Sequence, residues 1–281
     1  MGSGRWSRRK KLLLVTGASG FLGRHLTTTE AARDWEIYAP SSTSLDIRNR
    51  ELVDDEIHGW KPTAVVHLAY RKDDQRTIVA GSTNVARAAV AAGARLVHVS
   101  TDLVFGGRAH PYTEADELAP FGDYGRWKAE AEHAVADLAP EAAIVRTSLM
   151  YGTSRLATIQ QEVEDVLRGR SRIRFFTDEL RCPAHAFDVA AAVSQLAERP
   201  EVHGVIHVAG PDPVSRATLA HRFATWLGLD ASKVPTSSIA ESGMARAGRI
   251  VLDTARADAL GLRCRSLDEV LGTLGPVHRH P

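Results

Sequence analysis

Short apolar runs alternate with longer segments of mixed polarity along the first half of the chain. The apolar runs cover residues 12–15, 36–39, 64–69, 95–100 and 142–147. Such short runs are typical of strands that are buried on both faces of a parallel sheet. The intervening segments 21–32, 49–57, 78–92 and 124–138 predict helices. This order predicts an α/β fold with a doubly wound parallel sheet of the Rossmann type, because right-handed crossovers place helices on both faces.

The second half of the chain is less regular and predicts a smaller unit. Helices are expected at 158–168, 187–199 and 268–274, and residues 173–176 read as extended chain. Ser215 is the predicted N-cap of a further helix that runs to Gly228. We therefore expect a dinucleotide-binding domain over 11–150 and, over most of 151–281, a small C-terminal substrate-binding lobe, with 204–209 returning to the sheet.

Three glycines spaced by three follow the first apolar run directly. Gly17 permits a sharp turn, Gly20 lets the backbone approach a pyrophosphate, and Gly23 lets the next helix pack on the strand. The helix N-terminus adds free N–H groups for the phosphates. The simpler alternative is a glycine-rich turn that binds nothing. The motif predicts a dinucleotide site at the carboxyl end of the first strand.

Composition and charge argue against several classes of protein but do not identify the function. The net charge is +1, which implies no attraction to nucleic acid or membrane surfaces, and no apolar run approaches the ~20 residues of a membrane span. Cys182 and Cys264 form no disulfide framework and no metal-binding spacing, so we expect no metal site and a cytoplasmic location. Residues 1–10 are expected to be a flexible basic tail, since the apolar run after them is too short for a signal peptide.

Candidate chemistry lies at Tyr124 and Lys128, four residues apart and therefore on one face of a predicted helix. An ammonium near a phenol favours the phenolate, so we expect Lys128 to lower the pKa of Tyr124. Such a tyrosine suits proton donation to a carbonyl that receives hydride. Ser100 and Thr101 end a predicted strand and could hydrogen-bond the same oxygen. Spacing alone also arises by chance in many helices.

These motifs together resemble the extended short-chain dehydrogenase/reductase superfamily, and within it the dTDP-4-dehydrorhamnose reductase family of sugar-nucleotide ketoreductases. The resemblance covers nearly all of residues 11–275. It is carried by the segments 16–23, 45–47, 99–107, 124–128 and 145–152. The run Ser100-Thr101-Asp102 with Val104-Phe105, and the run Arg146-Thr147-Ser148, are the more specific parts.

The resemblance implies a role for each matching position. Thr101 matches the catalytic hydroxyl, Tyr124 the proton donor and Lys128 the residue that binds the nicotinamide ribose. The implied cofactor contacts are Gly17, Ser19, Gly20, Phe21 and Leu22 at the pyrophosphate, Asp46 and Ile47 at the adenine, and Leu68, Ala69 and Tyr70 near a ribose. Asn84 matches an asparagine that would support the active-site backbone.

The chain departs from the family pattern around the substrate. The family commonly has Tyr where Leu103 stands, Trp near Met150, and Gly-x-Pro-Thr where this chain reads Arg181-Cys182-Pro183-Ala184. We expect Leu103, Met150, Arg181 and Pro183 to contact a substrate that differs from the family's usual one.

NADP(H) is the preferred cofactor on sequence grounds, with NAD(H) as the alternative. An NAD-selective site places an acid at the end of the second strand, and here that end reads Ala39-Pro40-Ser41-Ser42. Arg24 could supply the charge for a 2′-phosphate.

The leading functional hypothesis is an NAD(P)-dependent reductase acting on the keto group of a nucleotide-linked sugar or a related carbonyl compound. One alternative is a non-catalytic, cofactor-binding regulatory subunit of the same fold. Another is a sugar-nucleotide epimerase or dehydratase, which would want an acid pair beside Thr101, whereas Asp102 stands alone. The expected partner is the small-molecule substrate, and a homodimer is left open.

Overall fold

A six-stranded parallel sheet forms the centre of the molecule, here described from a computed structural model over residues 11–29 and 32–272. The predicted tail at 1–10 lies outside these residues. The strand order is β10-β5-β4-β3-β1-β2. These strands are β1 (Lys11–Thr16), β2 (Trp35–Tyr38), β3 (Ala64–His67), β4 (Arg95–Thr101), β5 (Ala143–Thr147) and β10 (Gly204–His207). The chain thus returns at β10 to pair with β5, within the predicted returning segment.

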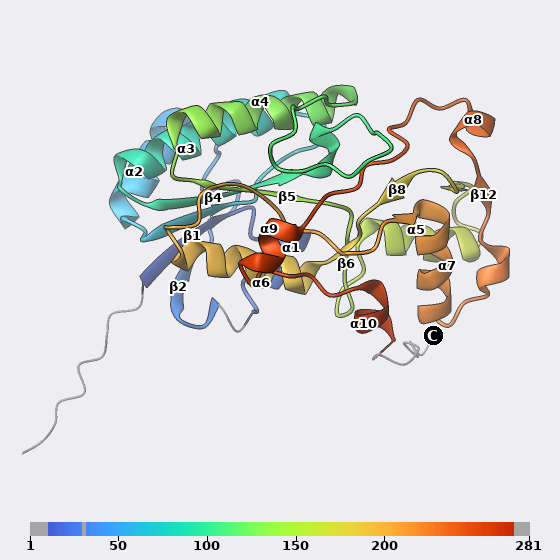
Figure 1. Ribbon diagram of the computed structural model, residues 1–281. Coiled ribbons are helices and arrows are strands. Elements are labelled where there is room, and N and C mark those ends of the chain that lie inside the picture. The colour runs from blue at the N-terminus through green and yellow to red at the C-terminus, as the bar shows by residue number, and fades with distance from the viewer. Residues whose placement is uncertain (1–10, 30–31, 273–281) are drawn as a thin grey trace, which may run out of the picture.

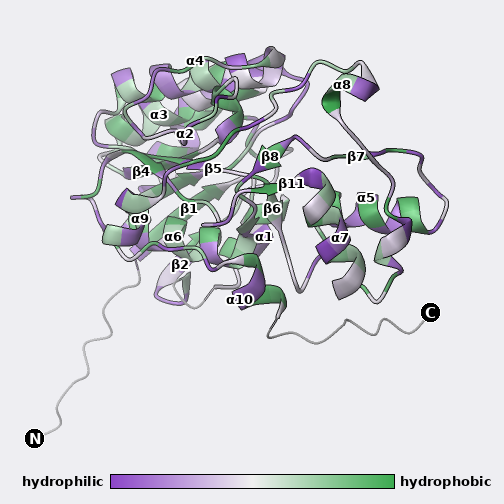
Figure 2. Ribbon diagram, turned by 45° about the vertical axis from the view of Figure 1, so that its right-hand side comes forward, coloured by the Kyte–Doolittle hydropathy of each residue, from purple (hydrophilic) through white to green (hydrophobic). Residues whose placement is uncertain are grey.

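Helices cover both faces of the sheet, as the alternating pattern predicts (Figure 1). One face carries α1 (Phe21–Leu26), α6 (Ala186–Glu198) and α9 (Ala255–Ala259), and the other carries α2 (Arg50–Trp60), α3 (Gly81–Ala91) and α4 (Gly122–Leu138). Successive strand residues enter opposite cores, because side chains alternate across a strand. Leu13 packs in the core under α6, and its neighbour Leu14 packs in the core under α2 and α3. Apolar residues are concentrated on the central strands (Figure 2).

The order of the strands fixes where a ligand can bind. β1 pairs with β2 on one side and with β3 on the other, so the chain reverses its direction of winding between β1 and β3. Ligands in open α/β sheets bind outside the carboxyl ends of the strands at such a point. The glycine loop after β1 lies there.

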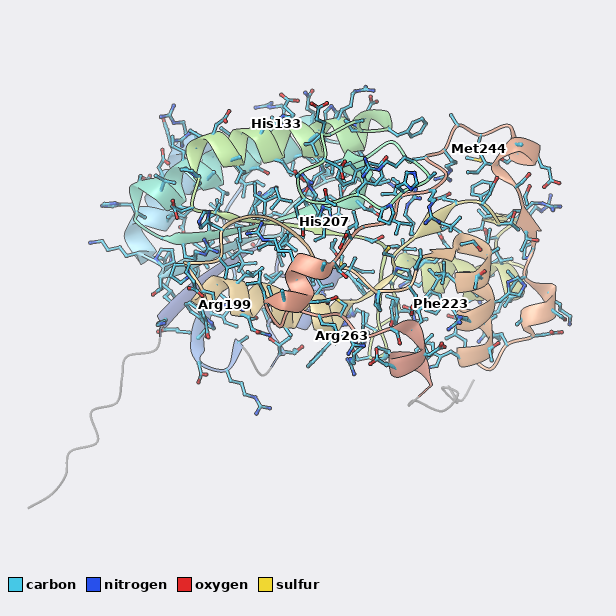
Figure 3. The ribbon with its side chains drawn as sticks, viewed as in Figure 1. His133, Arg199, His207, Phe223, Met244 and Arg263 are labelled. Atoms are coloured by element: carbon cyan, nitrogen blue, oxygen red, sulfur yellow. The ribbon has the colours of Figure 1, made fainter. Side chains whose placement is uncertain are left out.

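A smaller lobe adjoins this edge of the sheet (Figure 1). Its core includes Phe175, Val163 and Phe223, and Phe223 is labelled in Figure 3. The lobe contains α5 (Thr158–Leu167), α7 (Arg216–Trp226), α8 (Ile239–Ser242), α10 (Leu267–Leu271), β7 (Phe175–Phe176) and β12 (Thr236–Ser237). Two short pairs, β6 (Met150–Tyr151) with β9 (Ala184–His185) and β8 (Leu180–Arg181) with β11 (Val214–Ser215), run between lobe and sheet.

Several element boundaries differ from the expectation. The helix predicted at 21–32 ends at Leu26, because three consecutive β-branched threonines follow and their hydroxyls donate to carbonyls of the last turn. The helix predicted at 78–92 begins earlier, as a π-helical turn η2 (Arg76–Ala80), before α3. The Ser215 cap is confirmed, since its side chain accepts from the Thr218 N–H. The last helix begins at Leu267, and part of its predicted end lies outside the described residues.

Candidate active site

A cleft of about 770 Å³ runs along the carboxyl ends of β1, β3, β4 and β5 and is closed on its far side by the lobe. It brings together most of the residues predicted from the sequence. Those in its lining are Gly17, Gly20, Phe21, Leu22, Leu68, Tyr70, Thr101, Leu103, Tyr124, Lys128, Met150 and Arg181. Thus residues from four strand ends and from the lobe meet in one cavity.

Six predicted site residues lie outside this lining: Ser19, Arg24, Asp46, Ile47, Ala69 and Pro183. Arg24 donates from Nε to the Ser19 carbonyl at 2.8 Å, so its side chain folds back over the glycine loop. Pro183 is buried in the protein, between β8 and β9. The prediction that Pro183 contacts substrate therefore has no support from the cleft.

Asp46 and Ile47, the predicted adenine contacts, are both held by neighbouring side chains. Arg48 forms a two-pronged ion pair with Asp46 at 2.8–2.9 Å and lowers the pKa of this carboxyl to about 2. Asn84 donates from Nδ2 to the Ile47 carbonyl at 3.0 Å. Asn84 therefore supports the loop that carries Ile47, and the implied support of the active-site backbone stays a prediction.

Two of the three glycines of the first loop, Gly17 and Gly23, have the steric roles that their spacing predicts. Gly17 has φ +73°, and a Cβ there would lie 2.6 Å from the Ala69 nitrogen. A Cβ on Gly23 would lie 2.5 Å from the Ala18 Cα, so only glycine lets α1 pack this closely. A Cβ on Gly20 would meet only the Gly17 carbonyl oxygen, at 3.2 Å. The space beside Gly20 is otherwise open, as a backbone that cradles a ligand requires.

A buried hydrogen-bond chain supports this loop from behind. Ser82 donates to the Ile78 carbonyl at 2.6 Å, so it accepts from His67 Nε2 at 3.0 Å. His67 Nδ1 then carries no proton and accepts from the Thr16 hydroxyl at 2.7 Å. Burial lowers the pKa of His67 to about 3, which keeps this imidazole neutral. The chain ties β1 to β3 at the point where the winding reverses.

Tyr124 and Thr101 face each other at the centre of the cleft. Burial raises the pKa of Tyr124 well above its ordinary value, and hydrogen bonding with Thr101 opposes this rise. Lys128, four residues along α4, donates from Nζ to the Val99 carbonyl at 2.7 Å. Burial lowers the pKa of Lys128 to about 8. The expectation that Lys128 lowers the pKa of Tyr124 is wrong for this arrangement, because burial dominates and the ammonium is bonded to the backbone.

Gly125 is a site residue that the sequence reasoning missed. A Cβ at this position would collide with the Leu103 carbonyl oxygen. The first turn of α4, which carries Tyr124, therefore packs directly on η3 (Asp102–Val104), the short helix after Thr101. The glycine between Tyr124 and Lys128 was a visible signal for this close approach.

Asp102 is a buried carboxyl beside the Thr101 hydroxyl, the predicted catalytic hydroxyl. It accepts from the Ser148 hydroxyl at 2.6 Å and from the Thr101 hydroxyl at 3.3 Å. Burial raises the pKa of Asp102, and the nearby Arg181 guanidinium opposes that rise. Asp102 lines the cleft.

The lobe side of the cleft carries cations that the sequence reasoning did not assign. Arg155, Arg216 and Arg246 line it from three separate segments. Over the whole lining there are six Lys or Arg side chains and three Asp or Glu side chains, so the cleft favours an anion. The lining also has an apolar part, made of Leu103, Phe121, Leu149, Met150 and Met244. Met244, labelled in Figure 3, lies on the segment that follows α8.

The donor set of the cleft fits a dinucleotide with its nicotinamide end at Tyr124. The open Gly20 backbone and the first turn of α1, which has no side-chain cap, offer N–H groups to a pyrophosphate. Ser100 Oγ and Thr147 Oγ1 are buried in the lining and have no hydrogen-bond partner among residues 11–29 and 32–272. Buried hydroxyls are normally satisfied, so both are available to a bound polar group.

The sequence and the fold of this chain are similar to those of known proteins. Residues 10–272 match the model of the RmlD substrate binding domain. A dTDP-4-dehydrorhamnose reductase of Mycobacterium tuberculosis is 32% identical over 252 residues, covering 82% of this chain and 80% of that protein. Methionine adenosyltransferase 2 subunit beta of Rattus norvegicus is 28% identical, covering 90% of this chain and 84% of that protein. The crystal structure of a Bacillus anthracis dTDP-4-dehydrorhamnose reductase in complex with NADP superposes with a TM-score of 0.85, at 27% identity, covering 95% of this chain and 98% of that one.

Proposed function

This chain belongs to the RmlD substrate binding domain family and is an oxidoreductase of the extended short-chain dehydrogenase/reductase type, and we propose that it reduces the keto group of a nucleotide-linked sugar. The observation that carries the proposal is the meeting of Thr101, Tyr124 and Lys128 in one cleft with the open Gly20 loop. A purely structural role for these residues would not require them to line a cavity.

The protein's own residues supply the proton and the alignment in this reaction. The bound cofactor supplies hydride to the carbonyl carbon. Tyr124 gives its phenolic proton to the carbonyl oxygen, and its raised pKa keeps it protonated until that moment. Thr101 polarises the same oxygen through its hydroxyl. Lys128 holds the nicotinamide ribose with the N–H groups that Val99 leaves free.

The arginines and the apolar residues of the cleft lining indicate the class of substrate that we propose. The cationic wall of Arg155, Arg216 and Arg246 suits the diphosphate of a nucleotide sugar, since guanidinium groups bind phosphate oxygens in pairs. Leu103 and Met150 present apolar surface near the reacting hydroxyls, which suits a deoxygenated sugar ring better than a fully hydroxylated one.

NADP(H) is the proposed cofactor, with NAD(H) as the alternative. The end of β2 leads into Ser41 and its neighbouring hydroxyls, with no carboxylate to repel a 2′-phosphate. Asp46, the next acid, is neutralised by its two-pronged pair with Arg48. Arg24, on α1, folds its side chain back onto the Ser19 carbonyl of the glycine loop and is the proposed partner of the 2′-phosphate.

A regulatory subunit is the second candidate, because the chain also resembles a protein named as the beta subunit of an adenosyltransferase. The presence of Thr101, Tyr124 and Lys128 in the cleft favours the enzyme. An epimerase or dehydratase is less well supported, since Leu103 occupies the position directly after Asp102.

No helix in the described part of the chain is both long and apolar enough to cross a bilayer. We propose a cytoplasmic location from the two buried, free thiols, and leave a homodimer open.

One experiment separates these functions. The purified protein is mixed with NADPH and dTDP-4-dehydrorhamnose, and loss of reduced-cofactor absorbance is followed beside product analysis. Turnover that disappears in Tyr124→Phe supports the reductase. Tight cofactor binding without turnover on any nucleotide keto sugar would contradict it and favour the regulatory subunit. Sedimentation of the same sample gives the oligomeric state.

A further inference from the structure

Arg181 is a buried guanidinium whose donors face protein oxygens. Its side chain lies on β8 and is 7% exposed. It donates to the carbonyl oxygens of Leu180 at 2.7 Å, Ala247 at 2.9 Å and Gly248 at 3.3 Å. A guanidinium so occupied has little capacity for a substrate, although it borders the cleft. The contacts to Ala247 and Gly248 fix the segment that also carries Met244 and Arg246.

The same guanidinium lies between two buried carboxylates. Its Nη2 is 3.3 Å from Glu179 Oε1, and its Nε is 3.8 Å from Asp102 Oδ2. Both acid side chains are 5% exposed. Glu179 in turn lies 4.0 Å from Arg246 Nε. Charges of alternating sign therefore connect the cationic wall of the cleft, through Glu179 and Arg181, to Asp102.

Asp102 links this row of charges to the Thr101 hydroxyl through a hydrogen bond. Thr101 donates its proton to Asp102 at 3.3 Å and accepts from the Leu103 N–H at 3.2 Å. The second oxygen of Asp102 accepts from Ser148 at the shorter distance of 2.6 Å. The Thr101 bond is the long one, so its proton can turn to a substrate oxygen at small cost while Asp102 stays anchored by Ser148.

We propose that Arg181 is a positioning residue: its charge keeps Asp102 ionised beside Thr101, and its bonds to the Ala247 and Gly248 carbonyls fix the segment that carries Arg246 in the wall of the cleft. The expected effect of Arg181 on turnover rests on the proposed reductase function, whereas its expected effect on the ionisation of Asp102 does not. An unpaired carboxylate in this dry environment would take up a proton. A protonated Asp102 would donate to Ser148 or Thr101 and so redirect the Thr101 hydroxyl.

The charged and titratable groups that face Asp102 come from every element packed on it. Arg181 lies on β8 and Glu179 directly before it, Tyr124 faces Asp102 from α4, and the Cys182 thiol follows β8. Burial raises the pKa of Cys182 to about 11, so this thiol is neutral at physiological pH. Tyr124 is neutral for the same reason. Arg181 is thus the cation that balances Asp102.

Two variants separate the two parts of the role. Arg181→Lys keeps the charge and loses the bonds to the Ala247 and Gly248 carbonyls, whereas Arg181→Gln loses the charge as well. The Asp102 carboxyl carbon, assigned by comparison with Asp102→Asn, is titrated by NMR. We expect its midpoint near the parent value in Arg181→Lys and higher by about one pH unit or more in Arg181→Gln. Binding of dTDP, measured by calorimetry, should weaken in both variants, and NADPH affinity should stay unchanged.

Arg146→Gln is the matched control. Arg146 lies on β5 and is equally buried, and it pairs at 2.8 Å with Glu132 of α4, but it neither lines the cleft nor contacts Asp102. We expect it to cost stability without moving the Asp102 titration or the dTDP affinity. With the sugar substrate, kcat/KM should fall by about 10²-fold in Arg181→Gln, since a small misplacement can cost that much.

The outcomes are distinguishable. An unchanged Asp102 midpoint in Arg181→Gln, or changes of equal size in Arg146→Gln, would overturn the positioning role. Weakened dTDP binding with a shifted midpoint supports it, even if the parent protein turns over no keto sugar. That last result would overturn the proposed function alone.

Discussion

The Lys128 ammonium donates a hydrogen bond to the Val99 carbonyl oxygen at 2.7 Å and so joins α4 to the end of β4. This bond holds a buried cation in the lining of the cleft that also contains the Thr101 and Tyr124 hydroxyls. It also places the lysine where backbone, and not the phenol of Tyr124, is its partner. Burial then lowers the pKa of Lys128 to about 8 and raises that of Tyr124.

The lowered pKa of Lys128 predicts opposite pH trends for stability and activity. Between a pH of about 8 and the ordinary Lys pKa of 10.5, Lys128 is protonated in the unfolded chain and neutral in the folded chain. The contribution of Lys128 to the free energy of unfolding therefore rises with pH in this range. If the Lys128 ammonium binds the cofactor ribose as proposed, cofactor affinity should fall as pH rises through about 8. Denaturant unfolding and NADPH binding across this range check both trends. Lys128→Met should bind cofactor poorly at every pH and lack both trends.

Tyr124→Phe should lose most of the turnover and keep the cofactor. Removing the phenolic proton deletes general-acid catalysis, which is typically worth roughly 10²–10⁴-fold. The ring itself remains to pack near Tyr70, 5.9 Å away, so folding should be unaffected. Steady-state rates and NADPH dissociation constants are compared for parent and variant. Equal rates at every pH would mean that another group donates the proton.

Gly20→Val and Gly23→Ala should fail in different ways. Gly20 borders open space, so a side chain there blocks the pyrophosphate while the fold survives. A methyl group on Gly23 would lie only 2.5 Å from the Ala18 Cα, so even alanine forces α1 off the strand and lowers stability. Thermal unfolding and NADPH titration distinguish these effects. Parent-like cofactor affinity in Gly20→Val would place the pyrophosphate elsewhere.

Arg24→Ala should reduce the preference for NADPH over NADH. The expected cause is loss of the cation that meets the 2′-phosphate, since Ser41 and its neighbours provide only hydroxyls. Dissociation constants for both reduced cofactors are measured side by side at one ionic strength, because this contact is exposed to salt screening. Arg48→Ala serves as the comparison, since this nearby arginine pairs with Asp46. Tighter binding of NADH by the parent would contradict the preference itself.

The sequence was sufficient where the information is local. Apolar runs and their spacing predicted all six strands of the central sheet, and Gly17 and Gly23 predicted the tight turn and the close packing of α1, because turn sterics depend on adjacent residues. The Tyr124 and Lys128 spacing likewise put both residues in one cleft. Helix ends were less accurate, since the hydroxyls of consecutive threonines compete with helix continuation after Leu26.

Only the tertiary structure decided which distant groups meet and how burial changes their chemistry. Arg181 and Asp102 are 79 positions apart in the sequence and lie side by side in the fold. Arg181 donates to protein carbonyl oxygens, whereas the sequence suggested that it contacts substrate. The cationic wall likewise joins Arg155, Arg216 and Arg246 from separate segments of the lobe. Neighbouring residues fix local backbone geometry, whereas the pKa of a buried group depends on desolvation and on charges brought in by the whole fold. The sequence by itself thus determined the fold class and the proposed catalytic pair of Tyr124 and Lys128, and the packed structure determined the electrostatic environment of this pair.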